Sequence, residues 1–148
     1  MKFDYGHWRL LPGTQALYAA SVVDVRTESD ALVVTGYDRP VHSRWDLLNG
    51  AIITARFSSP MPNVIRVQLT HFQGQRQRLP VFDLDYSMTN PAASIGRDDQ
   101  KAWLETGNLR VEVPVEGEWR LSFTRNGKRL TESEPKAELD RFCDAMIA

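Results

Sequence analysis

Residues 119–131 read WRLSFTRNGKRLT, and this stretch carries the strongest fold signal in the chain. Trp119, Leu121 and Phe123 alternate with polar residues, which is the two-residue period of a half-buried β-strand. Asn126-Gly127 follows them, and this dipeptide favours a type I′ hairpin turn because both central residues of that turn need positive φ. The stretch therefore predicts two antiparallel strands joined by a tight turn.

The same alternation recurs upstream in two clear stretches. Their apolar members are Ile65, Val67 and Leu69 in the first and Leu109, Val111 and Val113 in the second. Four other segments carry weaker strand patterns, namely Trp8–Leu11, Ala20–Thr27, Ala31–Tyr37 and Ile52–Ser58. Clusters of Gly, Pro, Asn and Asp separate these segments, as turns between strands do. The first 131 residues are therefore predicted to be mainly β, as an antiparallel β-sandwich domain.

Polar clusters also predict how the strands connect. Ser29-Asp30 is expected to turn the chain between two early strands, and Thr106-Gly107-Asn108 is expected to turn it between two later ones. Residues 74–100 are rich in Arg, Gln, Asp and Pro and show no sustained period, apart from a short strand pattern at Val81–Leu84. We therefore predict a long loop over most of residues 74–100.

The carboxyl-terminal residues 132–148 change to a helical period. Leu139, Phe142, Cys143 and Met146 stand at positions i, i+3, i+4 and i+7, which form one apolar stripe on a helix. Ser133 suits the N-cap, and Glu134 and Pro135 suit the first turn. A helix of about fourteen residues is marginal in isolation. We therefore expect one amphipathic α-helix that packs on the β domain.

Composition excludes several classes of partner. A chain of 148 residues fits one domain with a buried core, and its formal net charge of −1 offers no basic surface for a phosphate backbone, so no nucleic-acid partner is expected. MKFDYGHWRLLPG at the amino terminus is too polar for a signal peptide, and no apolar run reaches membrane-spanning length. With one cysteine there is no intrachain disulfide. A cytoplasmic, soluble protein with no membrane partner is expected.

Candidate catalytic or ligand-binding residues are sparse. His7, His42 and His71 lie far apart without metal-ligand spacing, and the carboxylates of Asp83 and Asp85 offer too few oxygens for a hard cation. Cys143 belongs to the apolar helix stripe, with no neighbouring base to make a thiolate. We therefore assign no catalytic, cofactor-binding or metal-binding residue, and we expect no cofactor.

Four tryptophans could form a stacking platform for sugar rings, and they are Trp8, Trp45, Trp103 and Trp119. Each falls in or beside an alternating segment, where a large aromatic side chain usually fills the core. A core position is therefore the favoured interpretation of each tryptophan. Carbohydrate remains a candidate partner.

Five blocks in order resemble the amino-terminal domain of bacterial α-xylosidases of glycoside hydrolase family 31. They are GHWRLLPG near the start, ITARFSSP at 53–60, VIRVQLTHFQG at 64–74, ETGNLRVEV at 105–113 and WRLSFTRNGKRLT at 119–131. The resemblance implies an incomplete β-sandwich of the galactose-mutarotase type. In the family it precedes a (β/α)₈ barrel whose two aspartates perform retaining hydrolysis. It implies a non-catalytic scaffold or subunit-contact domain here, because the chain holds no such barrel.

Residues 131–148, TESEPKAELDRFCDAMIA, resemble instead a segment near the carboxyl terminus of decarboxylating glycine dehydrogenase. Three hypotheses follow: the non-catalytic β domain of an α-xylosidase-like enzyme, a carbohydrate-binding module, and a recombined or engineered chimera without evolved activity.

A sandwich cut short would leave apolar residues without partners, and the candidates are Ile53, Val67, Leu69 and Leu121. We therefore expect a homo-oligomer, joined by strand pairing, by face packing or by exchange of the carboxyl-terminal helix. The alternative is that this helix covers the open face of its own chain.

Overall fold

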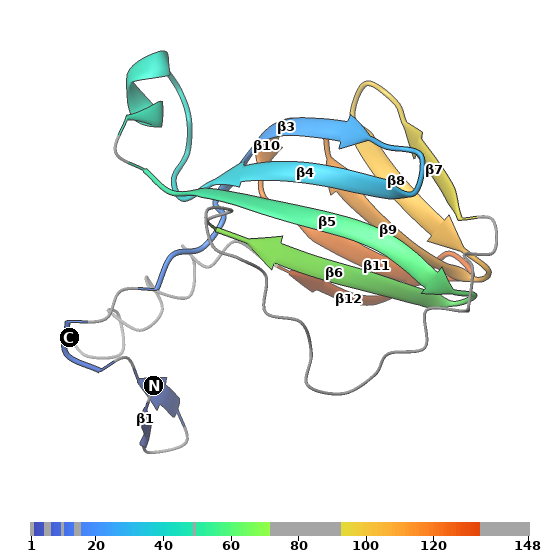
Figure 1. Ribbon diagram of the computed structural model, residues 1–148, viewed down its shortest axis with the longest axis horizontal. Coiled ribbons are helices and arrows are strands. Elements are labelled where there is room, and N and C mark those ends of the chain that lie inside the picture. Colours follow the sequence, from blue (N-terminus) through green and yellow to red (C-terminus); the bar gives the residue numbers. More distant parts are fainter. Residues whose placement is uncertain are drawn as a thin grey trace.

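A computed structural model describes residues 2–4, 7–9, 11–13, 16–48, 50–71 and 93–133 of the chain. Within these ranges the protein is mainly β, with two five-stranded antiparallel sheets that face each other (Figure 1). This confirms the predicted antiparallel β architecture. The predicted helix lies outside the described residues, apart from Glu132 and Ser133, which belong to the last strand. Within the described residues, no helix is long and apolar enough to cross a membrane.

The first sheet has the strand order β10-β3-β4-β5-β6. Its strands are β10 (Gly117–Glu118), β3 (Ser21–Thr27), β4 (Ala31–Tyr37), β5 (Ile52–Met61) and β6 (Val64–Thr70). The second sheet has the order β12-β11-β9-β8-β7. Its strands are β12 (Lys128–Ser133), β11 (Leu121–Arg125), β9 (Leu109–Pro114), β8 (Lys101–Thr106) and β7 (Ser94–Arg97). Separately, β1 (Lys2–Asp4) and β2 (His7–Arg9) form a two-stranded hairpin, and η1 (Arg44–Leu47) is a 3-10 helix.

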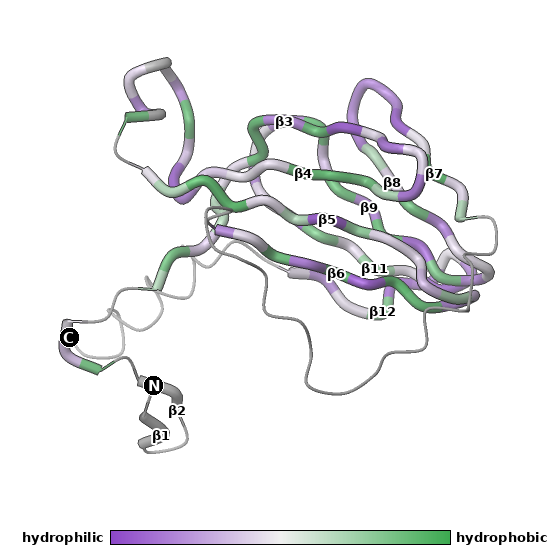
Figure 2. Tube along the Cα trace, in the orientation of Figure 1, coloured by the Kyte–Doolittle hydropathy of each residue, from purple (hydrophilic) through white to green (hydrophobic). Residues whose placement is uncertain are grey.

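The core lies between the two sheets, where the alternating apolar residues meet. On the second sheet, Val111 and Val113 of β9 and Leu104 of β8 are fully or almost fully buried. Opposite them, Phe57 of β5 and Leu32 of β4 are also fully buried in the same cluster. Much of β4, which is central in the first sheet, is hydrophobic (Figure 2). The predicted faces of β9 and β11 are therefore confirmed.

Tight turns join the strands where the sequence predicts them. Asn126 and Gly127 have φ values of 50° and 76°, as a type I′ turn requires, and they connect β11 to β12. Gly107, at φ 58°, begins the turn between β8 and β9. Pro62-Asn63, in one of the Pro and Asn clusters that the sequence places between strands, joins β5 to β6. Asn63 has φ 60°, so this dipeptide has the residue types and the positive φ of a type II turn.

Three hydrogen bonds tie the sheets together at two of their corners. At one corner, the Ser59 hydroxyl donates to the Thr106 hydroxyl at 2.8 Å inside the protein, and the Asn108 N–H donates to the Asn63 side-chain oxygen at 2.7 Å. At the edge where β3 lies near β7, the Arg97 guanidinium donates to the Val25 carbonyl at 2.7 Å. These polar contacts fix the sheets relative to each other where the apolar core ends.

Trp119 closes one end of the space between the sheets. Its backbone N–H donates to the Ala20 carbonyl at 2.9 Å as the chain passes from β10 in the first sheet to β11 in the second. Its buried ring lies against Gly36 of β4, where a Cβ atom would stand 2.6 Å from two ring carbons. Gly36 therefore provides the space that the indole ring occupies.

Two details of the predicted strands are wrong. Residues 94–97 form β7, where the sequence predicts a long loop over most of residues 74–100. Pairing with the neighbouring strand β8 makes these residues a strand although their sequence shows no sustained period. Of the four apolar residues expected to lack partners, Val67 and Leu69 on β6 are indeed 39% and 65% exposed, but Ile53 and Leu121 are buried in the core, so the expectation is wrong for these two. β6 is an edge strand, so its alternating pattern does not guarantee that the opposite sheet covers it. Residues 81–84, the other strand pattern, lie outside the described residues.

We expect Gly36→Ala to destabilise the fold by about 1–3 kcal/mol, because the added methyl group overlaps the Trp119 ring. Urea unfolding of the single variant measures this loss. In a Trp119→Leu background the same change should cost clearly less than in the wild type, because the overlapping ring atoms are gone. Equal costs in both backgrounds would contradict the packing described here.

Candidate functional site

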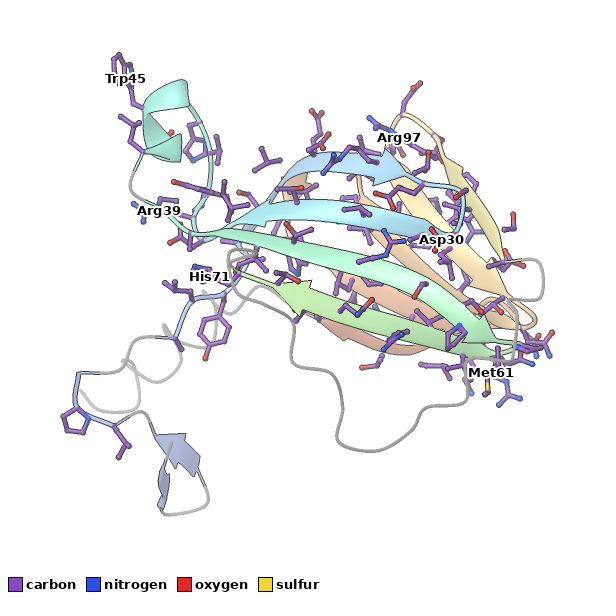
Figure 3. The ribbon with its side chains drawn as sticks, in the orientation of Figure 1. Asp30, Arg39, Trp45, Met61, His71 and Arg97 are labelled. Carbon is purple, nitrogen blue, oxygen red and sulfur yellow. The ribbon has the colours of Figure 1, made fainter. Side chains whose placement is uncertain are left out.

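The most prominent surface feature is a projecting lobe of residues 38–51 between β4 and β5 (Figure 1). This lobe contains η1, and Trp45 stands at its tip, pointing away from both sheets (Figure 3). Trp45 is 70% exposed and Leu48 is 57% exposed. The predicted core position of Trp45 is therefore wrong. A large aromatic side chain on a projecting loop is typical of a contact surface.

Local hydrogen bonds make the tip of the lobe a defined structure. The Asp46 carboxylate accepts hydrogen bonds from the backbone N–H groups of His42 at 2.9 Å and Ser43 at 2.6 Å. The Leu48 N–H donates to the Trp45 carbonyl at 3.1 Å, which closes the turn behind the indole. These bonds hold the backbone on both sides of Trp45, so little conformational entropy remains to be lost when the tip binds a partner.

Two contacts join the neck of the lobe to the first sheet, through Ser21 of β3 and Tyr37 of β4. Two more, from Asp38 to Ala51 and from Arg39 to Asp38, lie within the neck itself. The Asp38 N–H donates to the Ala51 carbonyl at 3.2 Å, and the Ser21 hydroxyl of β3 donates to the Arg39 carbonyl at 2.8 Å. The Arg39 guanidinium pairs with Asp38 at 3.0 Å and lies over the Tyr37 ring at 5.9 Å. The lobe is therefore anchored to two neighbouring strands rather than to its own ends alone.

The other tryptophans divide between core and surface. Trp119 is buried, which confirms its predicted position. Trp103 is only partly buried and lies on the outer face of the second sheet, against Gly96 of β7, so its predicted core position is wrong. The Arg110 guanidinium lies 4.7 Å from the centre of the Trp103 ring. The side chain of Trp8 lies outside what the structure describes.

Two shallow depressions on the outer faces of the sheets are lined by charged and polar residues. One, of about 420 Å³, lies on the second sheet, where Arg110 pairs with Glu112 at 2.8 Å and with Glu105 at 3.4 Å. The other, of about 570 Å³, lies on the first sheet around Arg56. Arg56 pairs with Glu28 and, at 2.9 Å, with Asp30, and the hydrogen bond that its guanidinium donates to the Glu28 carboxylate raises the pKa of Arg56.

The carboxylates of the described residues are arranged for charge pairing rather than for proton transfer. A general acid at neutral pH needs a raised pKa. Hydrogen bonds instead lower the pKa of three aspartates. The backbone N–H groups of His42 and Ser43 donate to Asp46, and the Arg39 side chain donates to Asp38. The backbone N–H groups of Lys101 and Gln100 donate to Asp98. These three carboxyl groups are therefore ionised at neutral pH, and each accepts hydrogen bonds from neighbouring groups of the protein.

The structure does not bring the predicted histidines together into a site. His42 lies in the lobe and His71 follows β6, while the side chain of His7 is not described. Asp83, Asp85 and Cys143 lie outside the described residues. Within the described ranges, no group of three or more His, Cys, Asp or Glu residues could hold a metal ion.

Comparisons with known proteins point to one class of enzyme. The chain is 30% identical over 138 residues to the α-xylosidase XylQ of Lactiplantibacillus pentosus, a match that covers 93% of this chain and 18% of that protein. It is also 30% identical over 89 residues to an α-xylosidase of Emericella nidulans, covering 59% of this chain and 11% of that protein. No protein-family model matches the chain. The chain thus spans less than a fifth of the length of these curated relatives.

These matches support the family 31 resemblance, and they give no support to glycine dehydrogenase or to a chimera. The longer match leaves only ten of the 148 residues outside it, so it includes at least residues 11–138. The similarity to the α-xylosidase therefore continues past residue 131, where the sequence analysis placed a joint.

The conformation of the lobe is expected to depend on pH through Asp46. Because its folded-state pKa lies below the ordinary 3.8, its carboxylate stabilises the lobe above that pH, and this stabilisation is lost as pH falls through the lowered value. The Trp45 fluorescence, taken as the difference between wild type and Trp45→Phe, should change as pH falls below 3.8. Asp46→Asn removes the titration and should remove this step. An identical step in both proteins would exclude Asp46 as its cause.

Proposed function

We propose that this chain is a non-catalytic β domain of an α-xylosidase-like glycoside hydrolase, and that its role is to make contacts with other protein surfaces. The observation that carries the proposal is the lobe of residues 38–51, which presents Trp45 and Leu48 to solvent on an anchored backbone. The match to less than a fifth of the length of α-xylosidases supports a part-protein role.

The chemistry of the described residues agrees with this role. Retaining hydrolysis needs a carboxylate nucleophile and a carboxylic acid about 5–5.5 Å apart on either side of the glycosidic bond. Here Glu105 and Glu112 are paired with Arg110, and Glu28 and Asp30 are paired with Arg56. Each of these four carboxylates is thus held by an arginine on the outer face of a sheet. Contact rather than catalysis is the function that these surfaces support.

Binding of carbohydrate is a second candidate function, because the same Trp45 ring offers an apolar face to solvent. Sugar rings stack on such faces through their C–H groups, and the hypothesis of a carbohydrate-binding module requires a solvent-facing tryptophan. Oligosaccharides that carry α-linked xylose should then quench the fluorescence that Trp45 contributes. Trp45→Phe would keep part of the affinity and Trp45→Ala would lose it. Unchanged fluorescence at millimolar oligosaccharide would leave only the contact role.

We expect the purified 148-residue chain to release no product from a chromogenic α-xyloside. The reason is that the carboxylates of Glu105, Glu112 and Asp46 are held by arginine or by backbone N–H groups rather than placed as an acid and a nucleophile across a glycosidic bond. A heat-denatured sample of the same preparation is the blank. Turnover above this blank that persists through two further purification steps would overturn the non-catalytic assignment.

The contact role predicts association through the lobe. Light scattering at micromolar concentration should give a mass above the 16.9 kDa of one chain, and Trp45→Ala should lower it. Leu130→Ala is the matched control, because Leu130 is also exposed but lies on β12 of the second sheet. A mass of 16.9 kDa at all concentrations, or equal effects of the two variants, would contradict self-association through the lobe.

A further inference from the structure

Ile65, Val67 and Leu69 form a strip, here called the β6 strip, on the core-facing side of an edge strand. Val67 pairs with Phe57 and Leu69 pairs with Ala55, and both partners are fully buried in the core. Neighbours across a ladder project to the same face of the sheet. Val67 and Leu69 therefore face the inside of the sandwich, although they are 39% and 65% exposed.

The strip is exposed because the sandwich opens along one margin. β6 ends the first sheet and β12 ends the second, while on the opposite margin β3 is joined to β7 by the Arg97 bond to Val25. Next to β12, Phe123 of β11 is only partly buried at the border of the core. An apolar surface therefore lines the inside of the margin between β6 and β12.

The chain leaves β12 at the end of the molecule where the strip is most exposed. Ser133, the last residue of β12, pairs with Leu121, two residues after Trp119. Trp119 packs on Gly36 of β4, and Gly36 pairs with Ile53 of β5. The residue after Ile53 is Thr54, which pairs with Thr70, the last residue of β6. The carboxyl ends of β6 and β12 thus lie at the same end of the sandwich, which is the end of the strip that carries Leu69.

The length and pattern of residues 134–148 match the strip. Five residues precede Leu139, and extended they reach about 17 Å, enough to cross the margin. The apolar stripe from Leu139 to Met146 would be about 10 Å long on a helix. The strip from Ile65 to Leu69 is about 13 Å long. The two apolar surfaces are therefore of nearly equal length.

We propose that residues 134–138 cross the open margin between β6 and β12, and that residues 139–147 form an amphipathic helix that lies along the β6 strip of the same chain and closes this margin. Because the segment is tethered at Ser133, its effective concentration at the strip is about millimolar, well above that of a second copy in a micromolar solution. The apolar stripe of Leu139, Phe142, Cys143 and Met146 is the surface that contacts Val67 and Leu69. This proposal does not depend on the proposed function.

The single native cysteine makes the docking directly measurable. A disulfide needs two Cα atoms about 4.4–6.8 Å apart, so an engineered cysteine on the strip should join Cys143 under mild oxidation. A helix that begins beside Leu69 and runs along β6 places Cys143 near Val67. Val67→Cys is therefore the principal variant, and Leu69→Cys is the second. Val23→Cys is the control, because Val23 is similarly exposed but lies on β3 at the opposite margin.

For Val67→Cys or Leu69→Cys, the expected result is an intramolecular disulfide with Cys143, seen as a monomer that migrates faster on a non-reducing gel. The yield of this disulfide should be at least tenfold lower for Val23→Cys. Free thiols in both strip variants, or equal yields at Val23, would overturn the proposal. Disulfide-linked dimers would also overturn it, because they would show that a second copy occupies the strip.

A second measurement tests the docking without cysteine chemistry. Phe142→Asp should lower the melting temperature by several degrees, because a carboxylate would replace an apolar group at the strip. Asp140→Asn changes the predicted outer face of the same helix and should leave the melting temperature unchanged. Equal melting temperatures for the two variants would mean that the segment does not pack on the sheet.

Discussion

The contact between Trp119 and Gly36 is the constraint on which the rest of the two-sheet arrangement depends. The chain has to pass from the first sheet to the second between β10 and β11, and it does so across the end of the core. A backbone crossing there exposes polar groups to an apolar interior unless they are paired. The Trp119 N–H is paired with the Ala20 carbonyl, and the indole ring fills the space that Gly36 leaves open. Both sheets are thereby held at one separation.

Closure at this end has consequences for the two margins of the sandwich. The Ser59 bond to Thr106 and the Asn63 bond to Asn108 fix one corner at the far end, and Arg97 fixes the edge between β3 and β7. The margin between β6 and β12 is the one that these contacts leave open. An exposed apolar strip there follows from the topology, because both strands are at sheet edges. The contacts that assemble the core therefore also determine that the exposed apolar strip lies at the margin between β6 and β12.

Sequence alone predicted the strands well where burial and alternation coincide. Val111 and Val113 lie inside because the opposite sheet covers them, and Asn126-Gly127 adopts the turn that its positive φ values allow. Alternation places Val67 and Leu69 on the correct face of β6 but does not predict their exposure, because a two-residue period identifies a face of the sheet and not whether another layer covers it. The turn at Pro62-Asn63 falls in one of the Pro and Asn clusters between strands, and its type could also have been predicted, since Pro followed by Asn favours a type II turn.

Trp45 shows why the candidate site was harder to predict than the fold. A tryptophan near a strand pattern is usually a core residue, and nothing in its neighbours' hydrophobicity distinguishes it from Trp119. The distinguishing feature is Asp46, whose carboxylate accepts hydrogen bonds from the backbone of His42 and Ser43 and so favours a tight turn over a strand. An acidic residue three positions after Ser43 is the capping-box pattern, which could have placed Trp45 on a projecting turn. Because the turn satisfies its own backbone groups, it can project from the sheets and hold the Trp45 indole outside the core, 70% exposed.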